Sequence, residues 1–166
     1  MKKWLVPTAV LASIFAAASP AVAAGRSGPQ IPLDGVTITR DCGNPEAGGF
    51  VVSGVLSGGF KEITAPDGTI ISPSPALKVT LTANGKTVSY VITGVTRSTT
   101  TNGLTDVIAT GKNLINRPDI NPDPDVVVAG LYVTTGNVTF TNGPDGEVVP
   151  FSGPGRVTDV CAVLAP

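Results

Sequence analysis

Apolar and polar residues alternate with a period of two along much of the chain, between clusters of turn-forming residues. One example begins at Leu77, where Leu77, Val79 and Leu81 alternate with polar side chains. This period predicts strands with one buried face and one solvent-exposed face. No segment shows helical periodicity, and strands are predicted at residues 36–39, 50–56, 60–64, 77–82, 87–95, 105–110, 126–134, 138–141 and 156–164.

Dipeptides of Gly with Asn or Asp separate several of these strands. They supply the positive φ angles that a tight hairpin turn needs, and they lie at 84–85, 102–103, 136–137, 142–143 and 145–146. Short connections place consecutive strands side by side. The predicted fold is therefore all-β, a single antiparallel meander domain of about eight strands. A meander slightly favours a closed barrel over a two-sheet sandwich.

The segment at 126–133 departs from this alternation, because it is apolar on both faces. Such a strand is either covered on both sides or part of an exposed apolar patch. It also supports one functional alternative, a barrel whose interior holds an apolar ligand.

The N-terminus has the three parts of a secretory signal peptide. Lys2 and Lys3 precede an apolar stretch at 4–18, and small residues follow at 19–24. The apolar stretch is shorter than the roughly 20 residues that span a bilayer, and Pro7 and Pro20 interrupt it. We therefore expect a signal peptide at 1–24, a flexible Gly, Pro and Ser-rich leader at 25–34, and one β-domain at 35–166. The mature protein is predicted to be secreted and extracellular, with no membrane span.

Cleavage of this signal changes the charge of the chain. Removing Lys2 and Lys3 leaves nine of the eleven basic side chains against twelve acidic ones, a formal net charge of −3. Binding of phosphate backbones requires a basic surface, so a nucleic-acid partner is not expected.

The chain has two cysteines, Cys42 and Cys161. In an oxidising compartment an even number of cysteines indicates a disulfide, and this pair is the only intramolecular option. A bridge closing a loop of this length stabilises a domain by about 4 to 5 kcal/mol in the chain-entropy model. A redox-active or metal-binding pair is disfavoured, because the chain lacks both the C-x-x-C spacing and histidine.

The best metal candidates are Asp119, Asn121, Asp123 and Asp125, four oxygen-bearing side chains at alternate positions. They resemble the first half of a calcium loop. The sixth position is proline and the twelfth is glycine rather than glutamate, so the EF-hand pattern is broken and a solvated Pro and Asp-rich loop is favoured. No cofactor is predicted, with calcium at this loop as the alternative.

Composition removes most of the common catalytic arrangements. The chain has no histidine, which excludes Ser-His-Asp and Cys-His nucleophiles, and no catalytic residue is singled out. Tyr90 and Tyr132 are the candidate pocket residues. No tryptophan remains after signal cleavage and few aromatic residues could form a sugar-binding platform, so a glycosidase or a carbohydrate-binding module is disfavoured. The run Ser98-Thr99-Thr100-Thr101 could form a flat threonine array, but threonine is also common on the wet face of a strand, and that interpretation is preferred.

Three segments carry a resemblance to a known group of proteins. They are residues 38–42, 108–114 and 151–161, which contain both cysteines, several glycines and strand residues. They resemble small secreted bacterial all-β proteins of unassigned function. The resemblance implies a shared scaffold and brings no catalytic or binding residues with it.

Three functions are compatible with these observations. The preferred one is a secreted, non-enzymatic binding or cell-surface-associated domain whose partner is an extracellular ligand or a cell-wall component. The second is a small barrel that carries an apolar ligand. The third is an enzyme that uses carboxylates or lysine, with a pocket that gathers Tyr90 or Tyr132 and an acidic side chain.

Overall fold

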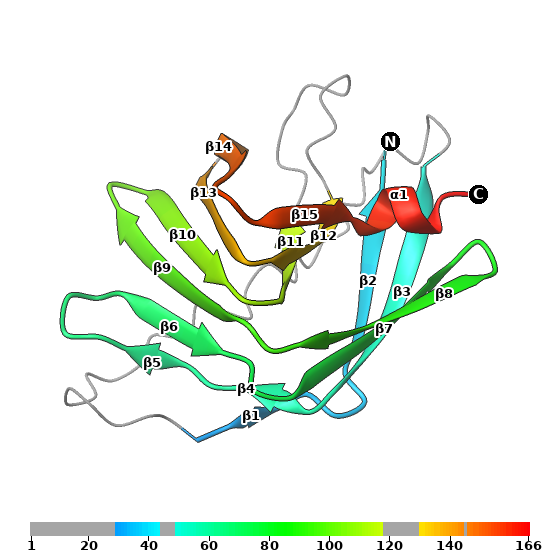
Figure 1. Ribbon diagram of the computed structural model, residues 1–166, viewed down its shortest axis with the longest axis horizontal. Helices are drawn as coiled ribbons and strands as arrows, with labels where there is room; N and C mark the ends of the chain where they lie inside the picture. Colours follow the sequence, from blue (N-terminus) through cyan, green and yellow to red (C-terminus); the bar gives the residue numbers. More distant parts are fainter. Residues whose placement is uncertain (1–28, 44–48, 118–129, 145) are drawn as a thin grey trace, which may run out of the picture.

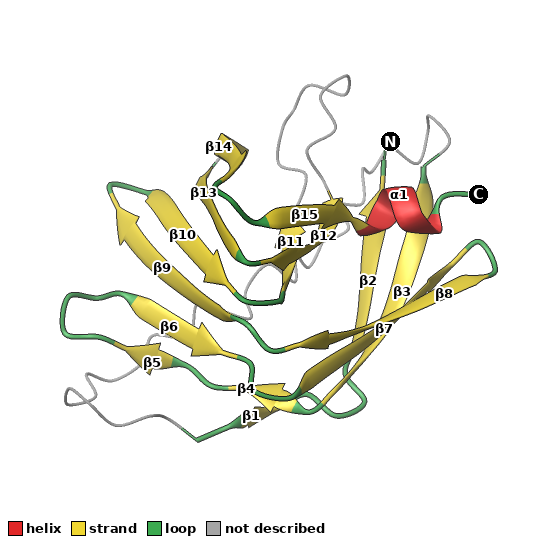
Figure 2. Ribbon diagram, in the orientation of Figure 1, coloured by secondary structure: helices red, strands yellow, loops and turns green. Residues whose placement is uncertain are grey.

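The computed structural model describes residues 29–43, 49–117, 130–144 and 146–166 (Figure 1). These residues form fifteen strands and one short helix, coloured by type in Figure 2. The elements are β1 (Ile31–Pro32), β2 (Thr37–Cys42), β3 (Phe50–Ser57), β4 (Gly59–Phe60), β5 (Ile63–Thr64), β6 (Ile70–Pro73), β7 (Leu77–Ala83), β8 (Lys86–Ile92), β9 (Val95–Thr101), β10 (Leu104–Thr110), β11 (Asn113–Arg117), β12 (Gly130–Thr135), β13 (Asn137–Gly143), β14 (Gly146–Ser152), β15 (Arg156–Asp159) and α1 (Val160–Leu164).

All strand pairs are antiparallel, so the prediction of an antiparallel all-β fold is confirmed. A four-stranded sheet has the order β2-β3-β7-β8, and a six-stranded sheet has the order β14-β13-β10-β9-β6-β5. β11-β12-β15 and β1-β4 form two smaller sheets. None of these sheets closes on itself within the described ranges, so the preference for a barrel is not confirmed, and a sandwich-like arrangement fits.

The three-stranded sheet lies between the two large ones (Figure 1). β12 contacts β2 of the four-stranded sheet, and β15 contacts β13 of the six-stranded sheet. The chain leaves the six-stranded sheet after β10, forms the β11–β12 hairpin and returns as β13, which pairs with β10. This excursion, and the pairing of β3 with β7, replace the single meander that was predicted.

The Asn-Gly turns behave as their sequence predicts. Asn84 and Gly85 have φ of 50° and 72° in the turn between β7 and β8, and Asn102 and Gly103 have 52° and 81° between β9 and β10. Positive φ at both central residues is typical of the type I′ turn, whose twist matches that of the paired strands. The two hairpins therefore have a well-defined register.

Several strand boundaries differ from the predicted ones. The predicted strand 60–64 is divided between β4 and β5, and the predicted strand 87–95 ends at Ile92 before β9 begins at Val95. At the second boundary the backbone amides of Thr93 and Gly94 both bond to the carbonyl of Lys112, at 3.1 and 2.8 Å. The chain passes there from the four-stranded to the six-stranded sheet. β1, β6, β9, β11 and β14 were not predicted as strands of their own.

The predicted strand 156–164 is wrong in its second half, where α1 follows β15. The Asp159 side chain caps this helix by accepting a hydrogen bond from the Ala162 amide at 3.2 Å. Val160 and Leu164 are both fully buried. Their four-residue spacing places them on one helix face, and burial of that face favours the helix over a continued strand.

The buried apolar side chains form two clusters. Cluster one lies among the four-stranded sheet, β12 and α1, and consists of Cys42, Val52, Leu56, Leu77, Val79, Leu81, Ala83, Ile92, Leu131, Val133, Val160 and Leu164. Cluster two lies between the six-stranded and three-stranded sheets, and consists of Val107, Ala109, Ile115 and Phe140, with Tyr132 and Phe151 packed against it.

β12 contributes to both clusters. Leu131 and Val133 belong to cluster one, whereas Tyr132 packs against cluster two. The strand is therefore covered on both sides, which confirms one of the two interpretations of its doubly apolar sequence for the part from Gly130 onward. Residues 126–129 lie outside the described ranges.

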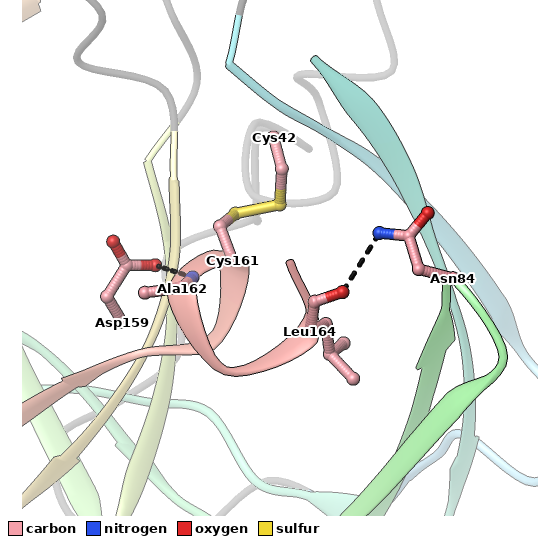
Figure 3. The surroundings of a disulfide bond; sticks show 6 residues. All are labelled: Cys42, Asn84, Asp159, Cys161, Ala162 and Leu164. Carbon is pink, nitrogen blue, oxygen red and sulfur yellow. Dashed lines mark hydrogen bonds between the residues drawn. A yellow bond between two sulfur atoms is a disulfide. The ribbon is translucent and has the colours of Figure 1, made fainter. Parts of the chain in front are cut away.

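The predicted disulfide joins Cys42 on β2 to Cys161 on α1, with a Cα–Cα distance of 5.5 Å (Figure 3). The Asn84 side chain donates to the Leu164 carbonyl at 2.9 Å, and the Lys86 Nζ donates to the Ala165 carbonyl. One bridge and two hydrogen bonds therefore fasten α1 to both edges of the four-stranded sheet.

The predicted signal peptide at 1–24 lies outside the described residues. Within the predicted leader, Ile31–Pro32 form β1, which pairs with β4. The Asp34 carboxylate accepts a hydrogen bond from the Gly58 amide at 2.7 Å. Of the part of the chain that the structure describes, no helix has the length and apolar character needed to cross a membrane.

Candidate functional site

The candidate site lies on the six-stranded sheet, where side chains alternate between the two faces. Val107 and Ala109 point inward to cluster two, so Asp106 and Ile108 point to the opposite face, which we call the outer face. Strand pairing extends this face to neighbouring strands. Its central residues are Thr69, Ile71, Arg97, Thr99, Asp106, Ile108, Thr139 and Thr141.

The outer face contains a shallow depression with a volume of about 320 Å³. Its floor comes from β6, β9 and β10, and its rim comes from the turn between β5 and β6. The lining residues are Ala65, Asp67, Thr69, Ile71, Arg97, Thr99, Asp106 and Ile108.

Register determines which of these side chains are neighbours. Arg97 lies opposite Ile108 on β10 and opposite Ile71 on β6. Thr99 lies opposite Asp106, which in turn lies opposite Thr141 on β13. A guanidinium flanked by two isoleucines therefore lies beside a row of hydroxyl and carboxylate groups.

Hydrogen bonds connect this polar row across the strands. The hydroxyls of Thr69 and Thr99 are 3.1 Å apart, and the Thr141 hydroxyl donates to Asp106 Oδ1 at 2.6 Å. Each threonine keeps further hydrogen-bonding capacity, and Asp106 keeps its second carboxylate oxygen. The row can therefore bind ligand hydroxyls without rearrangement of its own hydrogen bonds.

Asp67 adds a second carboxylate at the rim. Its Oδ1 accepts a hydrogen bond from the Thr69 amide at 3.0 Å. This backbone hydrogen bond, helped by one from the Thr69 side chain, lowers the pKa of Asp67 below 3.8. The hydrogen bond joins the turn to Thr69, the residue directly before β6.

Arg97 supplies the positive charge of the depression. Its side chain is exposed, and it forms no ion pair with any other residue of the described ranges. Ile108 beside it is 44% exposed. The depression thus combines donors from a guanidinium, acceptors from carboxylates, several hydroxyls and two apolar surfaces, a mixture suited to non-covalent recognition of a polar, hydroxylated ligand.

The candidate tyrosines lie in different surroundings. Tyr90 packs against cluster one and Tyr132 against cluster two, where the Tyr132 ring makes an edge contact with Phe151 at a centroid distance of 5.0 Å. Neither tyrosine lines the depression.

The proposed calcium ligands, Asp119, Asn121, Asp123 and Asp125, lie outside the described residues. Within the ranges that the structure describes, no three His, Cys, Asp or Glu side chains are grouped so that they could hold a metal ion.

The depression has no signature of its own in the sequence. The threonine-rich run at 98–101 forms the end of β9, where Thr99 lies on the outer face and its neighbours Ser98 and Thr100 lie on the opposite face. The available signal was Asn102-Gly103. A two-residue type I′ turn at this dipeptide places Thr99 opposite Asp106 and Arg97 opposite Ile108.

We compared the chain with protein-family models, with curated proteins and with solved structures, and none of the three comparisons gave a match.

Proposed function

We propose that the protein is a secreted, non-enzymatic binding domain that recognises a hydroxyl-rich polysaccharide of a cell surface at the depression on the outer face. The observation that supports this proposal is the row of hydroxyl and carboxylate groups beside Arg97 and two isoleucines. The disulfide is compatible with secretion.

A saccharide matches this mixture of groups. Its hydroxyls donate to the carboxylates of Asp67 and Asp106, and its oxygens accept from Arg97 and the threonines. Its aliphatic C–H surface packs on Ile71 and Ile108. Five of the lining residues lie on paired strands, so their side chains keep their spacing when the ligand binds: Ile71, Arg97, Thr99, Asp106 and Ile108.

The scarcity of aromatic residues disfavours a carbohydrate-binding module at the level of the sequence, and the contact surface of the depression is aliphatic rather than aromatic. The lining residues include two isoleucines and no aromatic ring. An aliphatic side chain lacks the flat ring on which sugars stack, so each sugar unit is held weakly. Weak contact per unit suits a polymer, which offers many units at once.

The alternative of an apolar-ligand carrier loses its original support. That alternative arose from the doubly apolar segment 126–133, and the described residues of β12 pack into clusters one and two. Packing within the protein therefore accounts for their apolar character. The enzymatic alternative needs Tyr90 or Tyr132 in a pocket with an acidic group, and neither tyrosine lines the depression.

Sedimentation with insoluble polysaccharides tests the proposal. The mature protein is mixed with chitin, cellulose, peptidoglycan and cross-linked polygalacturonate, and the bound fraction is measured after centrifugation. We expect at least one polymer to retain the protein. Arg97→Gln and Asp106→Asn are expected to weaken this retention by roughly 10-fold, the loss typical of one hydrogen bond to a charged group.

The matched control is Lys78→Gln, which removes an exposed cation from the four-stranded sheet. It is expected to bind as the unchanged protein does, and thermal unfolding confirms that all three variants are folded. Retention by none of the four polymers would contradict the proposal, as would equal losses for Arg97→Gln and Lys78→Gln.

A further inference from the structure

The polar groups of the outer face continue beyond the depression. Thr139 on β13 lies opposite Ile108, and its hydroxyl is 2.7 Å from that of Ser152 on β14. Thr141 on the same strand bonds to Asp106. Two rows of side chains therefore run across the strands, at right angles to the chain direction.

The first row passes through Thr69, Thr99, Asp106 and Thr141, and the second passes through Ile71, Arg97, Ile108, Thr139 and Ser152. The first row starts at Thr69, directly before β6, and the second starts at Ile71 on β6; both rows leave the depression at β13. Adjacent strands are about 4.8 Å apart, so the three spacings from β6 to β13 span about 14 Å. This distance exceeds one sugar ring and matches several linked units.

We propose that the ligand is an extended polysaccharide chain that lies across the strands, from the depression on β6, β9 and β10 to β13 and β14. This inference rests on the proposed function and adds the direction and minimum length of the bound chain. One end of the ligand occupies the depression, and the following units bind Thr141, Thr139 and Ser152.

The chemistry of the rows agrees with this orientation. Thr141 uses its proton on Asp106, so its oxygen accepts from the ligand. The Thr139 and Ser152 hydroxyls share one hydrogen bond, which leaves one donor and several acceptors. Val149, opposite Thr141, is 43% exposed and offers an aliphatic surface at the far end.

Affinity for oligosaccharides of different length tests the inference. Oligosaccharides of two and six units are prepared from the polysaccharide that retains the protein, and their dissociation constants are measured by calorimetry. We expect the six-unit ligand to bind at least roughly 10-fold more tightly, because additional units engage β13 and β14.

Two variants locate the effect. Thr99→Val changes the depression and is expected to weaken both ligands. Thr139→Val changes only the far part of the row, and it is expected to weaken the six-unit ligand by roughly 2- to 10-fold, the range for one neutral hydrogen bond, while leaving the two-unit ligand unchanged.

Thr80→Val is the matched control. Thr80 pairs with Ser89 across two strands at 3.0 Å, as Thr139 pairs with Ser152, but on the four-stranded sheet. It is expected to leave both affinities unchanged. Equal affinity for the two ligands, with no effect of Thr139→Val, would overturn the inference and confine the ligand to the depression. Failure of all polymers to bind would instead overturn the proposed function itself.

Discussion

The four-stranded and six-stranded sheets share hydroxyl pairs on their solvent-facing sides but differ in the size of the apolar cluster beneath them. Both solvent-facing sides have cross-strand hydroxyl pairs, Thr80 with Ser89 on the four-stranded sheet and Thr139 with Ser152 on the six-stranded sheet. Among the described residues, twelve form cluster one beneath the four-stranded sheet and four form cluster two beneath the six-stranded sheet. The disulfide also belongs to the four-stranded side, where it fastens α1.

The larger cluster and the depression lie on different sheets. Hydroxyl pairs occur on both sheets, so they do not by themselves define a binding site. The outer face of the six-stranded sheet adds a depression, the carboxylates of Asp67 and Asp106, and the guanidinium of Arg97. We therefore expect most of the folding stability to come from the four-stranded side, whereas the proposed ligand site lies on the six-stranded side.

The largest expected effect is loss of the disulfide. Replacing Cys42 and Cys161 together by serine is expected to lower the free energy of unfolding by about 4 kcal/mol, because the bridge joins residues 119 positions apart. Urea denaturation measures this change. An unfolding free energy equal to that of the unchanged protein would show that the hydrogen bonds of Asn84 and Lys86 hold α1 without the bridge.

The second effect compares the clusters directly, with the same substitution in each. Val79 in cluster one is 0% exposed and Val107 in cluster two is 8% exposed. Val79→Ala is expected to lower the free energy of unfolding by about 2 to 3 kcal/mol, and Val107→Ala by about 1 to 2 kcal/mol. The first value is larger because Val79 lies in the larger cluster, where truncation of a side chain removes more packing contacts. Thermal and urea unfolding give both values. A greater loss for Val107→Ala would reverse the assignment of stability.

The smallest effect concerns two asparagines in matched turns. Asn84 and Asn102 have φ of 50° and 52°, so alanine at either position meets the same backbone penalty. Only Asn84 also bonds to the Leu164 carbonyl. Asn84→Ala is expected to cost about 1 kcal/mol more than Asn102→Ala, the value of that hydrogen bond. Equal losses would show that the bond adds nothing to the attachment of α1.

Strands with one well-covered face were predictable from the sequence. In β7, Leu77, Val79 and Leu81 all pack into cluster one, so the alternation in the sequence matches the burial of one face of the strand. β9 was not predicted as a separate strand because it is almost entirely polar and no residue of it is fully buried. α1 has only five residues, too few for a helical period to be recognised, although Asp159 is a favourable N-cap.

Part of the candidate site was also accessible from the sequence. The turn at Asn102-Gly103 sets the register of β9 with β10, and so the neighbourhood of Thr99 and Asp106. The contribution of Ile71 was not accessible, because β6 pairs with β9 across the intervening β7–β8 hairpin. Such non-local pairing depends on how the sheets pack and leaves no local pattern.

Ligand binding at the outer face is tested most directly by a map of amide chemical shifts by NMR, with the six-unit oligosaccharide added to the folded protein. If the ligand binds the outer face, the largest shift changes fall at Thr69, Arg97, Asp106 and Thr139 of the six-stranded sheet. Changes concentrated around Lys78 on the four-stranded sheet, or no changes at saturating oligosaccharide, would contradict binding at this face.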